Sequence, residues 1–187
     1  EHLYKLGYRG VFNLDFLYDK ESGKVFANEC NPRFSGSFPM TSLVSMAQGL
    51  PPIDLFHIAE HMGIYMDFDI TALNRDYNFN STYAHTMIVI QDAEVMPINM
   101  KAGIYAHDQG AKITFKRYGL FPWELENDNE FLIVDPVLPQ GAPVNKGELR
   151  FCKLVFRTSI VNDSYNLKPV YGRLINRLST VLNKKAI

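Results

Sequence analysis

The sequence predicts an α+β protein with a largely antiparallel sheet and flanking helices. Three observations support this class: a strand-rich hairpin near the start, several short strands in the second half, and an amphipathic helix at the end. Hairpin, helices, strands and final helix follow in blocks. A strand and a helix do not alternate along the chain, as they would in a parallel α/β protein.

The first third is expected to hold a hairpin followed by two helices. EHLYKLG has the composition of the last turns of a helix that ends at Gly7. GVFNLDFLY and VFANECN are β-rich runs separated by the turn cluster DKESGK, which predicts a hairpin. Ser37 is the expected N-cap of a helix that ends at Gly49, and a second helix covers 53–63. Residues 64–81 are rich in Asn and Asp, so we expect mostly loop.

Strands are expected to dominate the second half. The candidate runs are YAHTMIVI, AEVMPIN, AKITFKRYG and EFLIVDPVL, with a last pair around GELRFCKLVFRTSIV. The tail over 167–186 has helical spacing, and its apolar face comprises Leu167, Val170, Tyr171, Leu174, Ile175, Leu178 and Leu182. We therefore expect two parts: 1–81, and a β-rich segment or appended domain over 82–187 with a terminal helix.

Composition narrows the class of protein. The formal net charge is −1, which does not favour a nucleic-acid or anionic membrane surface. No apolar run approaches the roughly 18 residues of a membrane span. Cys30 and Cys152 form no CxxC pair and are expected to be small buried hydrophobes. These features predict a cytoplasmic protein without nucleic-acid or membrane partners.

The hairpin brings polar residues together. A loop over 20–24 places Asp19 opposite Val25. The opposed pairs further along the strands are then Asp15 with Glu29 and Asn13 with Asn31. Side chains alternate between the faces of a strand, so these four share one face. The other face is expected to be core and holds Phe12, Leu14, Phe16, Tyr18, Phe26 and Cys30.

Two opposed carboxylates predict a metal site. Asp15 and Glu29 would lie roughly 5 Å apart and repel each other. A hard cation such as Mg²⁺ removes that repulsion, because it binds carboxylate oxygens together with substrate phosphates. Asn31, two residues after Glu29, points the same way and is a third candidate ligand. A solvated acidic surface remains the alternative, and a one-residue bulge would separate the pair.

The segment after the second strand has the features of an anion site. Arg33 remains on the polar face if the strand continues, and its planar guanidinium suits a phosphate or a carboxylate. The loop 34–37 then enters a helix N-terminus, where free N–H groups favour an anion. Ser35 and Ser37 add hydroxyl groups there.

The stretch GVFNLDFLYDKESGKVFANECNPRFSGSFPMTSLVSMAQGLPPIDL resembles the C-terminal core of ATP-grasp ligases. Within that family it resembles carbamoyl-phosphate synthetase, biotin carboxylase and the related carboxylate–amine ligases. The resemblance covers residues 1 to about 63. It implies that Asp15, Glu29 and Asn31 bind Mg²⁺, or Mn²⁺ in its place, and that Arg33 is catalytic. The residues expected to contact ATP are Asn13, Arg33, Ser35 and Ser37.

The family resemblance implies ATP-dependent ligation. A carboxylate is activated as an acyl-phosphate, and an amine or similar nucleophile then displaces phosphate. The family's glycine-rich phosphate loop and ATP-contacting lysines precede this region, and neither GxxxxGK[ST] nor GxGxxG occurs here. We therefore expect a fragment that has the metal half of the site, needs an N-terminal part of the same polypeptide, and binds nucleotide weakly alone.

Two other functions stay open. His57-Ile58-Ala59-Glu60-His61 matches the HxxEH pattern of inverted zinc peptidases, in which both histidines share a helix face. The apolar positions Leu55, Ile58, Ala59 and Met62 are expected to form the buried face of that helix, which leaves the histidines exposed. The second half could instead be a non-catalytic interaction module, and a homodimer is left open.

Overall fold

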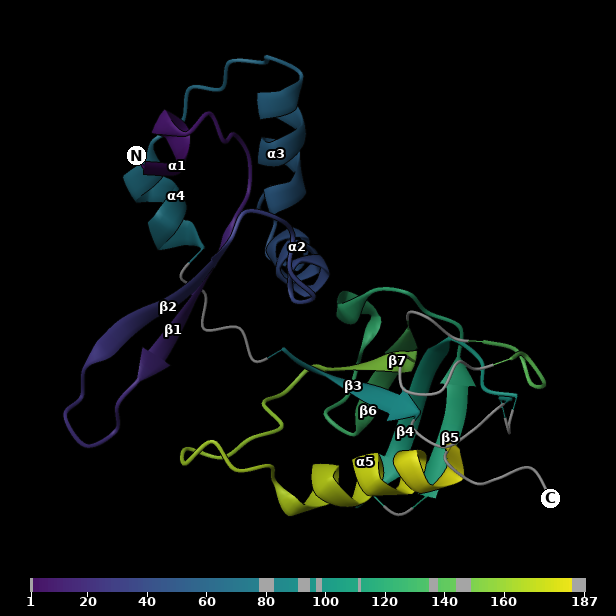
Figure 1. Cartoon of the computed structure of the whole chain (residues 1–187). Coiled ribbons are helices and arrows are strands. Elements are labelled where there is room, and N and C mark those ends of the chain that lie inside the picture. Colours follow the sequence, from purple (N-terminus) through teal and green to yellow (C-terminus); the bar gives the residue numbers. More distant parts are fainter. Residues whose placement is uncertain are drawn as a thin grey trace. The chain divides into compact units, whose positions relative to one another are not determined.

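The computed structural model describes residues 2–77, 83–90, 95–96, 99–110, 112–134, 138–143 and 149–182, with 90 and 149–151 described by backbone alone. The chain forms two compact units, Glu1–Asn80 and Ser81–Ile187. Helices and antiparallel sheets make up both units, so the predicted α+β class is confirmed (Figure 1). In the described part of the chain, no helix is both long enough and apolar enough to cross a bilayer.

Unit 1 is a hairpin with four short helices. Its elements are α1 His2–Lys5, β1 Asn13–Tyr18, β2 Val25–Asn31, α2 Phe38–Ala47, α3 Ile53–His61 and α4 Ile70–Asp76. The expected helix end at Gly7 is present: this residue has φ +85°, and the Tyr8 N–H donates to the Leu3 carbonyl at 2.9 Å. The hairpin extends away from the helices of its own unit (Figure 1).

Helix α4 lies within 64–81, where mostly loop was expected; 64–69 are loop, and 78–81 lie outside the described residues. Its first turn is capped by the Asp69 carboxylate, which accepts from the Thr71 N–H at 2.8 Å and the Ala72 N–H at 3.1 Å. An Asp that serves as an N-cap satisfies donors that a short helix leaves free. The Asp-rich composition therefore marked the start of a helix as well as a loop.

Unit 2 is a five-stranded antiparallel sheet with one long helix. Its elements are β3 Ala84–Ile90, β4 Gly103–Asp108, β5 Lys112–Arg117, the 3-10 turn η1 Pro122–Glu124, β6 Glu130–Val134, β7 Leu149–Phe156 and α5 Pro169–Leu182. The strand order is β3-β7-β6-β4-β5. Helix α5 lies against the sheet, as expected for the amphipathic tail (Figure 1).

Three strand predictions in this unit need correction. Strand β4 was not expected, because the small residues Gly103 and Ala106 weaken the apolar alternation of its sequence. In AEVMPIN, Val95 forms an isolated bridge with Pro143, and most of that run lies outside the described residues. The expected last strand pair is one strand, β7, followed by a bridge between Val161 and Leu167.

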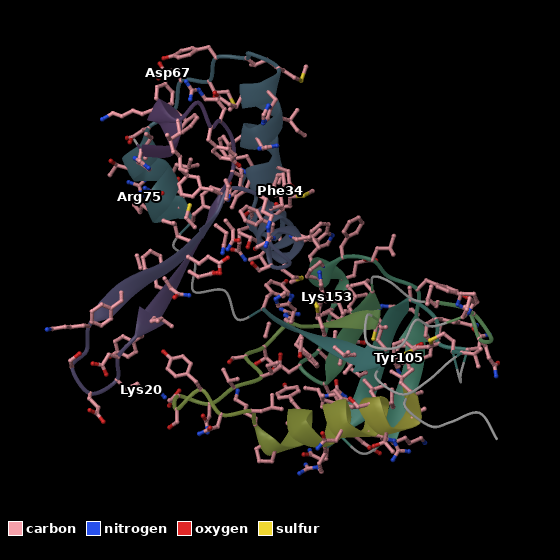
Figure 2. All side chains as sticks on the ribbon, viewed as in Figure 1. Lys20, Phe34, Asp67, Arg75, Tyr105 and Lys153 are labelled. Carbon is pink, nitrogen blue, oxygen red and sulfur yellow. The ribbon has the colours of Figure 1, made fainter. Side chains whose placement is uncertain are left out.

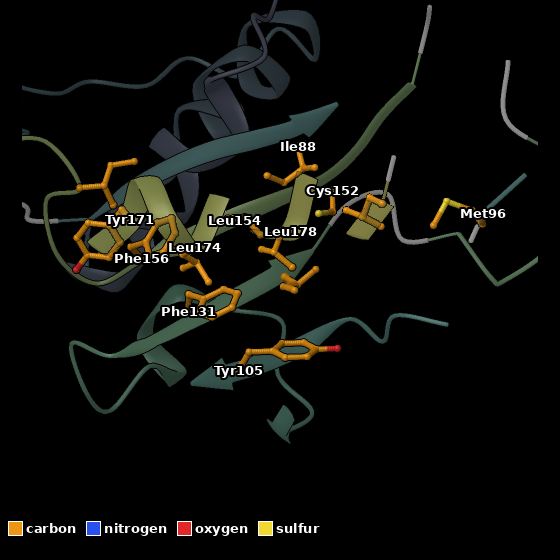
Figure 3. Packing of buried hydrophobic residues seen from close by; sticks show 13 residues of the cluster. Ile88, Met96, Tyr105, Phe131, Cys152, Leu154, Phe156, Tyr171, Leu174 and Leu178 are labelled. Carbon is orange, nitrogen blue, oxygen red and sulfur yellow. The ribbon is translucent and has the colours of Figure 1, made fainter. Parts of the chain in front are cut away.

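The hydrophobic core of unit 2 lies between α5 and the sheet. Tyr171, Leu174 and Leu178 of α5 pack toward Phe131 and Phe156 (Figure 3). The Phe156 and Tyr171 rings meet edge to face with centroids 5.1 Å apart. Aromatic contacts of this kind add to the stabilisation from buried area.

The apolar face of the hairpin in unit 1 is not core, contrary to the prediction. Phe16 is 57 % exposed and Leu14 is 46 % exposed, and Cys30 is exposed as well, whereas Cys152 is buried as expected. Burial raises the pKa of the Cys152 thiol to about 12. The alternation identified which side chains share a face, but burial also requires a partner element.

Candidate functional site

The predicted register of the hairpin is correct where the polar residues lie. Asp15 pairs with Glu29, and Asn13 pairs with Asn31. Between these pairs, Leu14 pairs with Cys30 on the other face of the ribbon. The four polar residues therefore share one face, as expected.

A β-bulge corrects the predicted pairing closer to the turn. The register shifts between Asp15 and Phe16, so Asn28 has no opposite residue, and Val25 pairs with Tyr18 in place of the expected Asp19. The true turn is one residue longer than predicted, and the extra residue on β2 compensates for it. Phe26 pairs with Leu17 and therefore leaves the face on which it was expected beside Leu14 and Phe16.

Asp19 has a local role in the turn. Its carboxylate accepts hydrogen bonds from the Ser22 hydroxyl and, at 3.0 Å, from the Glu21 N–H. These donors lower the pKa of Asp19 below its ordinary value. The turn thus closes through an Asx-type contact, far from the polar pairs. Figure 2 labels Lys20 at the turn end of the hairpin, and Phe34 beyond the opposite end.

Hydrogen bonds join four of the predicted site residues. The Asn13 amide donates to Asp15 Oδ1 at 2.7 Å, and the Asn31 amide donates to Asp15 Oδ2 at 3.4 Å. Arg33 Nη2 donates to Asn31 Oδ1 at 3.4 Å. The two 3.4 Å contacts are at the long end of the hydrogen-bond range, which leaves these groups able to rearrange around a ligand.

Glu29 completes the face from the opposite strand. It is exposed, and among the described residues no hydrogen bond or ion pair involves its carboxylate. No group of three or more His, Cys, Asp or Glu side chains that could hold a metal occurs within the described ranges. A protein site that surrounds a metal completely needs more ligands than Asp15, Glu29 and the Asn31 amide supply. That donor set fits Mg²⁺, which uses one or two carboxylates and completes its shell with waters and phosphates.

The helix N-terminus offers fewer free donors than expected. The Phe38 N–H donates to the Ser35 carbonyl at 3.2 Å, the Met40 N–H donates to the Ser37 carbonyl at 3.0 Å, and Pro39 has no N–H. Ser37 occupies the predicted cap position but its side chain makes no cap bond. The Ser35 and Ser37 hydroxyls lie 2.8 Å apart and remain available to an anion.

The HxxEH residues contact the entry to the hairpin. The Val11 N–H donates to His57 Nδ1 at 3.2 Å, and the His57 and His61 rings lie 4.4 Å apart between centroids. Glu60 pairs with Arg9 at 3.6 Å. A Cβ at Gly10 would lie 2.3 Å from His57 Nδ1, so the glycine permits this close approach.

The expected buried face of α3 is wrong apart from Ala59. Leu55, Ile58 and Met62 are exposed, while His57 is half-buried and its ring meets Phe34 edge to face at 4.8 Å. The helix turns its histidine side toward the hairpin entry. His61 is exposed as expected, whereas the contacts of His57 with Phe34 and Val11 were not predicted.

Arg9 is a residue that the sequence reasoning missed. Its guanidinium lies 3.5 Å from the centroid of the Tyr4 ring, and Nη1 donates to the carbonyls of Tyr4 and Tyr8 at 3.0 Å. Together with the Glu60 pair, these contacts fix the guanidinium beside α3. Arg9 and Glu60 are far apart in sequence, and no local pattern signals such a contact.

Comparisons with protein-family models, curated proteins and solved structures found no match to this chain. The proposed function therefore depends on the hairpin geometry and on the spacing of Asp15, Glu29, Asn31 and Arg33.

Proposed function

We propose that residues 13–37 form the metal- and phosphate-binding half of an ATP- and Mg²⁺-dependent ligase site. The observation that supports this proposal is the direct pairing of Asp15 with Glu29 on an exposed face. Opposed like charges destabilise a strand pair. A divalent cation between them turns this repulsion into a binding site, and the nearby Asn31 amide adds an oxygen ligand.

Each residue has a distinct role in this proposal. Asp15, Glu29 and Asn31 hold the metal, and Asn13 orients Asp15 through its 2.7 Å hydrogen bond. Arg33 contacts the transferring phosphoryl group. The hydroxyls of Ser35 and Ser37 bind phosphate oxygens. The metal, when bound, neutralises charge on the ATP phosphates, which is the main requirement of phosphoryl transfer.

The proposed reaction has two steps. A carboxylate oxygen of the acid substrate attacks the γ-phosphorus of ATP; the new O–P bond forms, the bond to ADP breaks, and ADP leaves. An amine or similar nucleophile then attacks the acyl carbon and phosphate leaves, with loss of one proton from the nucleophile. Arg33 stabilises the charge on the phosphoryl oxygens in both steps. We expect nucleotide to bind weakly to these 187 residues alone, because the sequence has neither common phosphate-loop motif.

Metal binding tests the proposal directly. Mn²⁺, a paramagnetic substitute for Mg²⁺, is titrated into the chain and followed by electron paramagnetic resonance. We expect Glu29→Gln to weaken Mn²⁺ binding by roughly tenfold or more, because one of two charged ligands is lost. Glu21→Gln, in the exposed turn of the same hairpin, is the matched control and should leave the affinity unchanged. Equal affinities in the wild type and Glu29→Gln would contradict the proposed site.

Turnover in the intact protein tests the ligase step. Phosphate release from ATP should fall by roughly 10²–10³-fold in Arg33→Ala, since a positioned cation at the transition state is lost. A wild-type rate would refute the role of Arg33.

The zinc-peptidase alternative has less support. A peptidase of this pattern needs both histidines and the glutamate free for zinc and for water. Here His57 Nδ1 already accepts a backbone N–H, and Glu60 is paired with Arg9. Elemental analysis distinguishes the two proposals, because stoichiometric tightly bound zinc would favour the peptidase.

A further inference from the structure

Two adjacent cavities lie in unit 1, and the smaller one is lined by Arg33. Their volumes are about 790 Å³ and about 630 Å³. Both are lined by Tyr8, Arg9, His57 and Glu60. The two cavities therefore adjoin, and each volume falls within the roughly 300–1,000 Å³ range of small-molecule sites.

The larger cavity has mainly apolar walls. Its lining includes Phe12, Leu14, Phe56, Ile64, Tyr65 and Phe68. Phe12 lies just before β1 and Leu14 lies within it, on the face of the hairpin opposite Asp15 and Glu29. The Phe56 and Phe68 rings meet edge to face at 5.3 Å. Apolar surface open to water in this way gains free energy when a hydrophobic group covers it.

The smaller cavity has a basic character. It is lined by Arg9, Arg33, His57 and His61, with Glu60 as its one acidic residue. Arg9 is already paired with Glu60, whereas the contacts of Arg33 within the described residues are hydrogen bonds to a carbonyl and an amide oxygen. Two guanidinium groups against one carboxylate leave a net positive site, which suits an added anion.

We propose that this pair of cavities binds a small carboxylic acid with an apolar body. The body occupies the larger cavity, and the carboxylate lies in the smaller one near Arg33. Arg33 also donates to Asn31 of the proposed metal site, so a carboxylate bound at Arg33 would lie near that site. The inference rests on the proposed ligase function and adds the chemical class of its acid substrate.

Calorimetry with three probes tests this assignment. 4-Phenylbutyrate has both parts of the proposed ligand, its primary amide lacks the charge, and acetate lacks the apolar body. We expect saturable binding of 4-phenylbutyrate, and about tenfold or weaker binding of the other two, because each loses one set of contacts. Equal binding of the acid and its amide would refute anion recognition. No binding of any probe would refute the proposed site.

A pair of leucine variants locates the site. Leu14 lines the larger cavity, whereas Leu17 on the same strand does not and is 58 % exposed. Leu14→Gln should weaken 4-phenylbutyrate binding at least about fivefold, because it places an amide in the apolar wall. Leu17→Gln should leave the affinity unchanged, and an equal loss in both variants would show nonspecific association with the hairpin.

The Mn²⁺ titration separates this inference from the proposed function. Leu14→Gln should bind Mn²⁺ as the wild type does, and Asp15→Asn should lose Mn²⁺ while it still binds 4-phenylbutyrate. If Mn²⁺ binds and the probe does not, the acid pocket is refuted and the metal site stands. The reverse result refutes the metal site alone.

Discussion

Asp15 and Glu29 are placed where electrostatics opposes folding. Directly opposed like charges on a strand pair cost free energy, on the order of the 0.2–1 kcal/mol that favourable cross-strand pairs contribute. In the described part of the chain, the hydrogen bonds that the Asp15 carboxylate accepts come from the Asn13 and Asn31 amides. A bound cation would offset this cost. Removal of one carboxylate, as in Glu29→Gln, should therefore weaken metal binding without destabilising the fold.

Arg117 and Glu130 show the opposite arrangement in unit 2. Arg117 Nη1 lies 2.7 Å from Glu130 Oε1, and Nη2 lies 3.1 Å from Oε2. The Glu126 N–H also donates to Glu130 Oε2 at 2.9 Å. The Arg117 hydrogen bond is the main cause that lowers the pKa of Glu130 below its ordinary value of 4.5. The side chain of Glu130 is buried, so its ionised form depends on the hydrogen bonds from Arg117 for stabilisation.

The lowered pKa predicts a pH-dependent contribution to stability. The folded state favours the ionised Glu130, so the contribution is fully present above the unfolded pKa near 4.5 and is lost as the pH falls through the lower folded pKa. We expect Glu130→Gln to lower the free energy of unfolding at pH 7 by roughly 1–3 kcal/mol, and the difference from wild type to shrink toward pH 3. Urea unfolding followed by Trp123 fluorescence measures both values.

Glu126→Gln is the matched control for that prediction. Its carboxylate lies 3.4 Å from Arg117 but its side chain is 71 % exposed. Exposed pairs contribute at most about 1 kcal/mol, so this variant should differ little from wild type at either pH. A Glu130→Gln effect that is the same at pH 7 and pH 3 would contradict the linkage.

Among the secondary-structure elements, the hairpin depends on its bulge. The turn leaves Tyr18 paired with Val25, and an unbroken ladder from there would place Asn28 opposite Asp15. Glu29 would then lie on the other face, since side chains alternate. The extra residue at Asn28 restores the pairing of the carboxylates, and so a local irregularity creates the candidate site.

Deletion of Asn28 tests this explanation. Without the extra residue, the outer ladder continues regularly and brings Glu29 opposite Asp15. We expect Mn²⁺ affinity to remain within about twofold of wild type, because the bulge only corrects the residue count. Cross-strand nuclear Overhauser contacts between Asp15 and Glu29 report the pairing. Contacts from Asp15 to Cys30 or Ala27 in their place would refute it.

Helix α5 is the element that closes the core of unit 2. Leu174 is fully buried between the helix and the sheet. We expect Leu174→Ala to lower the free energy of unfolding by roughly 2–5 kcal/mol through the cavity it leaves. Leu120→Ala, at a position that is 62 % exposed, is the matched control and should change it by no more than about 0.5 kcal/mol. Equal losses in chemical denaturation would show that the helix does not close the core.

Over the full chain, burial is divided unequally between the units. In unit 2 the fully buried apolar residues include Ile104, Phe131, Leu132, Ile133, Leu154, Val155, Phe156, Leu174 and Leu182. Among the described residues of unit 1, the buried apolar side chains are Phe38, Met40, Val44 and Ala59. An isolated two-stranded hairpin is marginally stable in water. We therefore infer that the two units differ in local stability.

Hydrogen exchange measures that difference. Amides of β4, β6 and β7 should exchange slowest, and those of the β1–β2 hairpin at least about 100-fold faster, because local opening costs less where fewer apolar contacts are broken. Amides of α5 serve as the internal reference for unit 2. Hairpin amides as slow as those of β6 would contradict the unequal division of burial.

Much of the secondary structure could be predicted because its signals are local. Gly7 marked a helix end. The Asp15–Glu29 pair was predicted from a loop over 20–24, and it is correct because the bulge at Asn28 offsets the longer turn. The failures also have local causes: Asp69 caps α4 within a segment whose composition predicts loop, and the glycine in β4 hid that strand. Nothing in the residue types of 11–31 revealed the bulge, because two runs joined by a six-residue or a five-residue turn have the same composition.

The order of residues alone sets which side chains of one element share a face: Glu29 with Asn31 on β2, and the apolar residues of α5 on one stripe. These patterns follow from the periods of strand and helix, which depend only on neighbouring residues. The pairing of Asp15 with Glu29 across the hairpin depends also on the bulge. Tertiary packing selects what each face meets. It exposed the apolar side of the hairpin, turned His57 toward Val11, and placed Arg9 beside Glu60. Such contacts join residues far apart in the chain, so they arise only when complete helices and strands pack together.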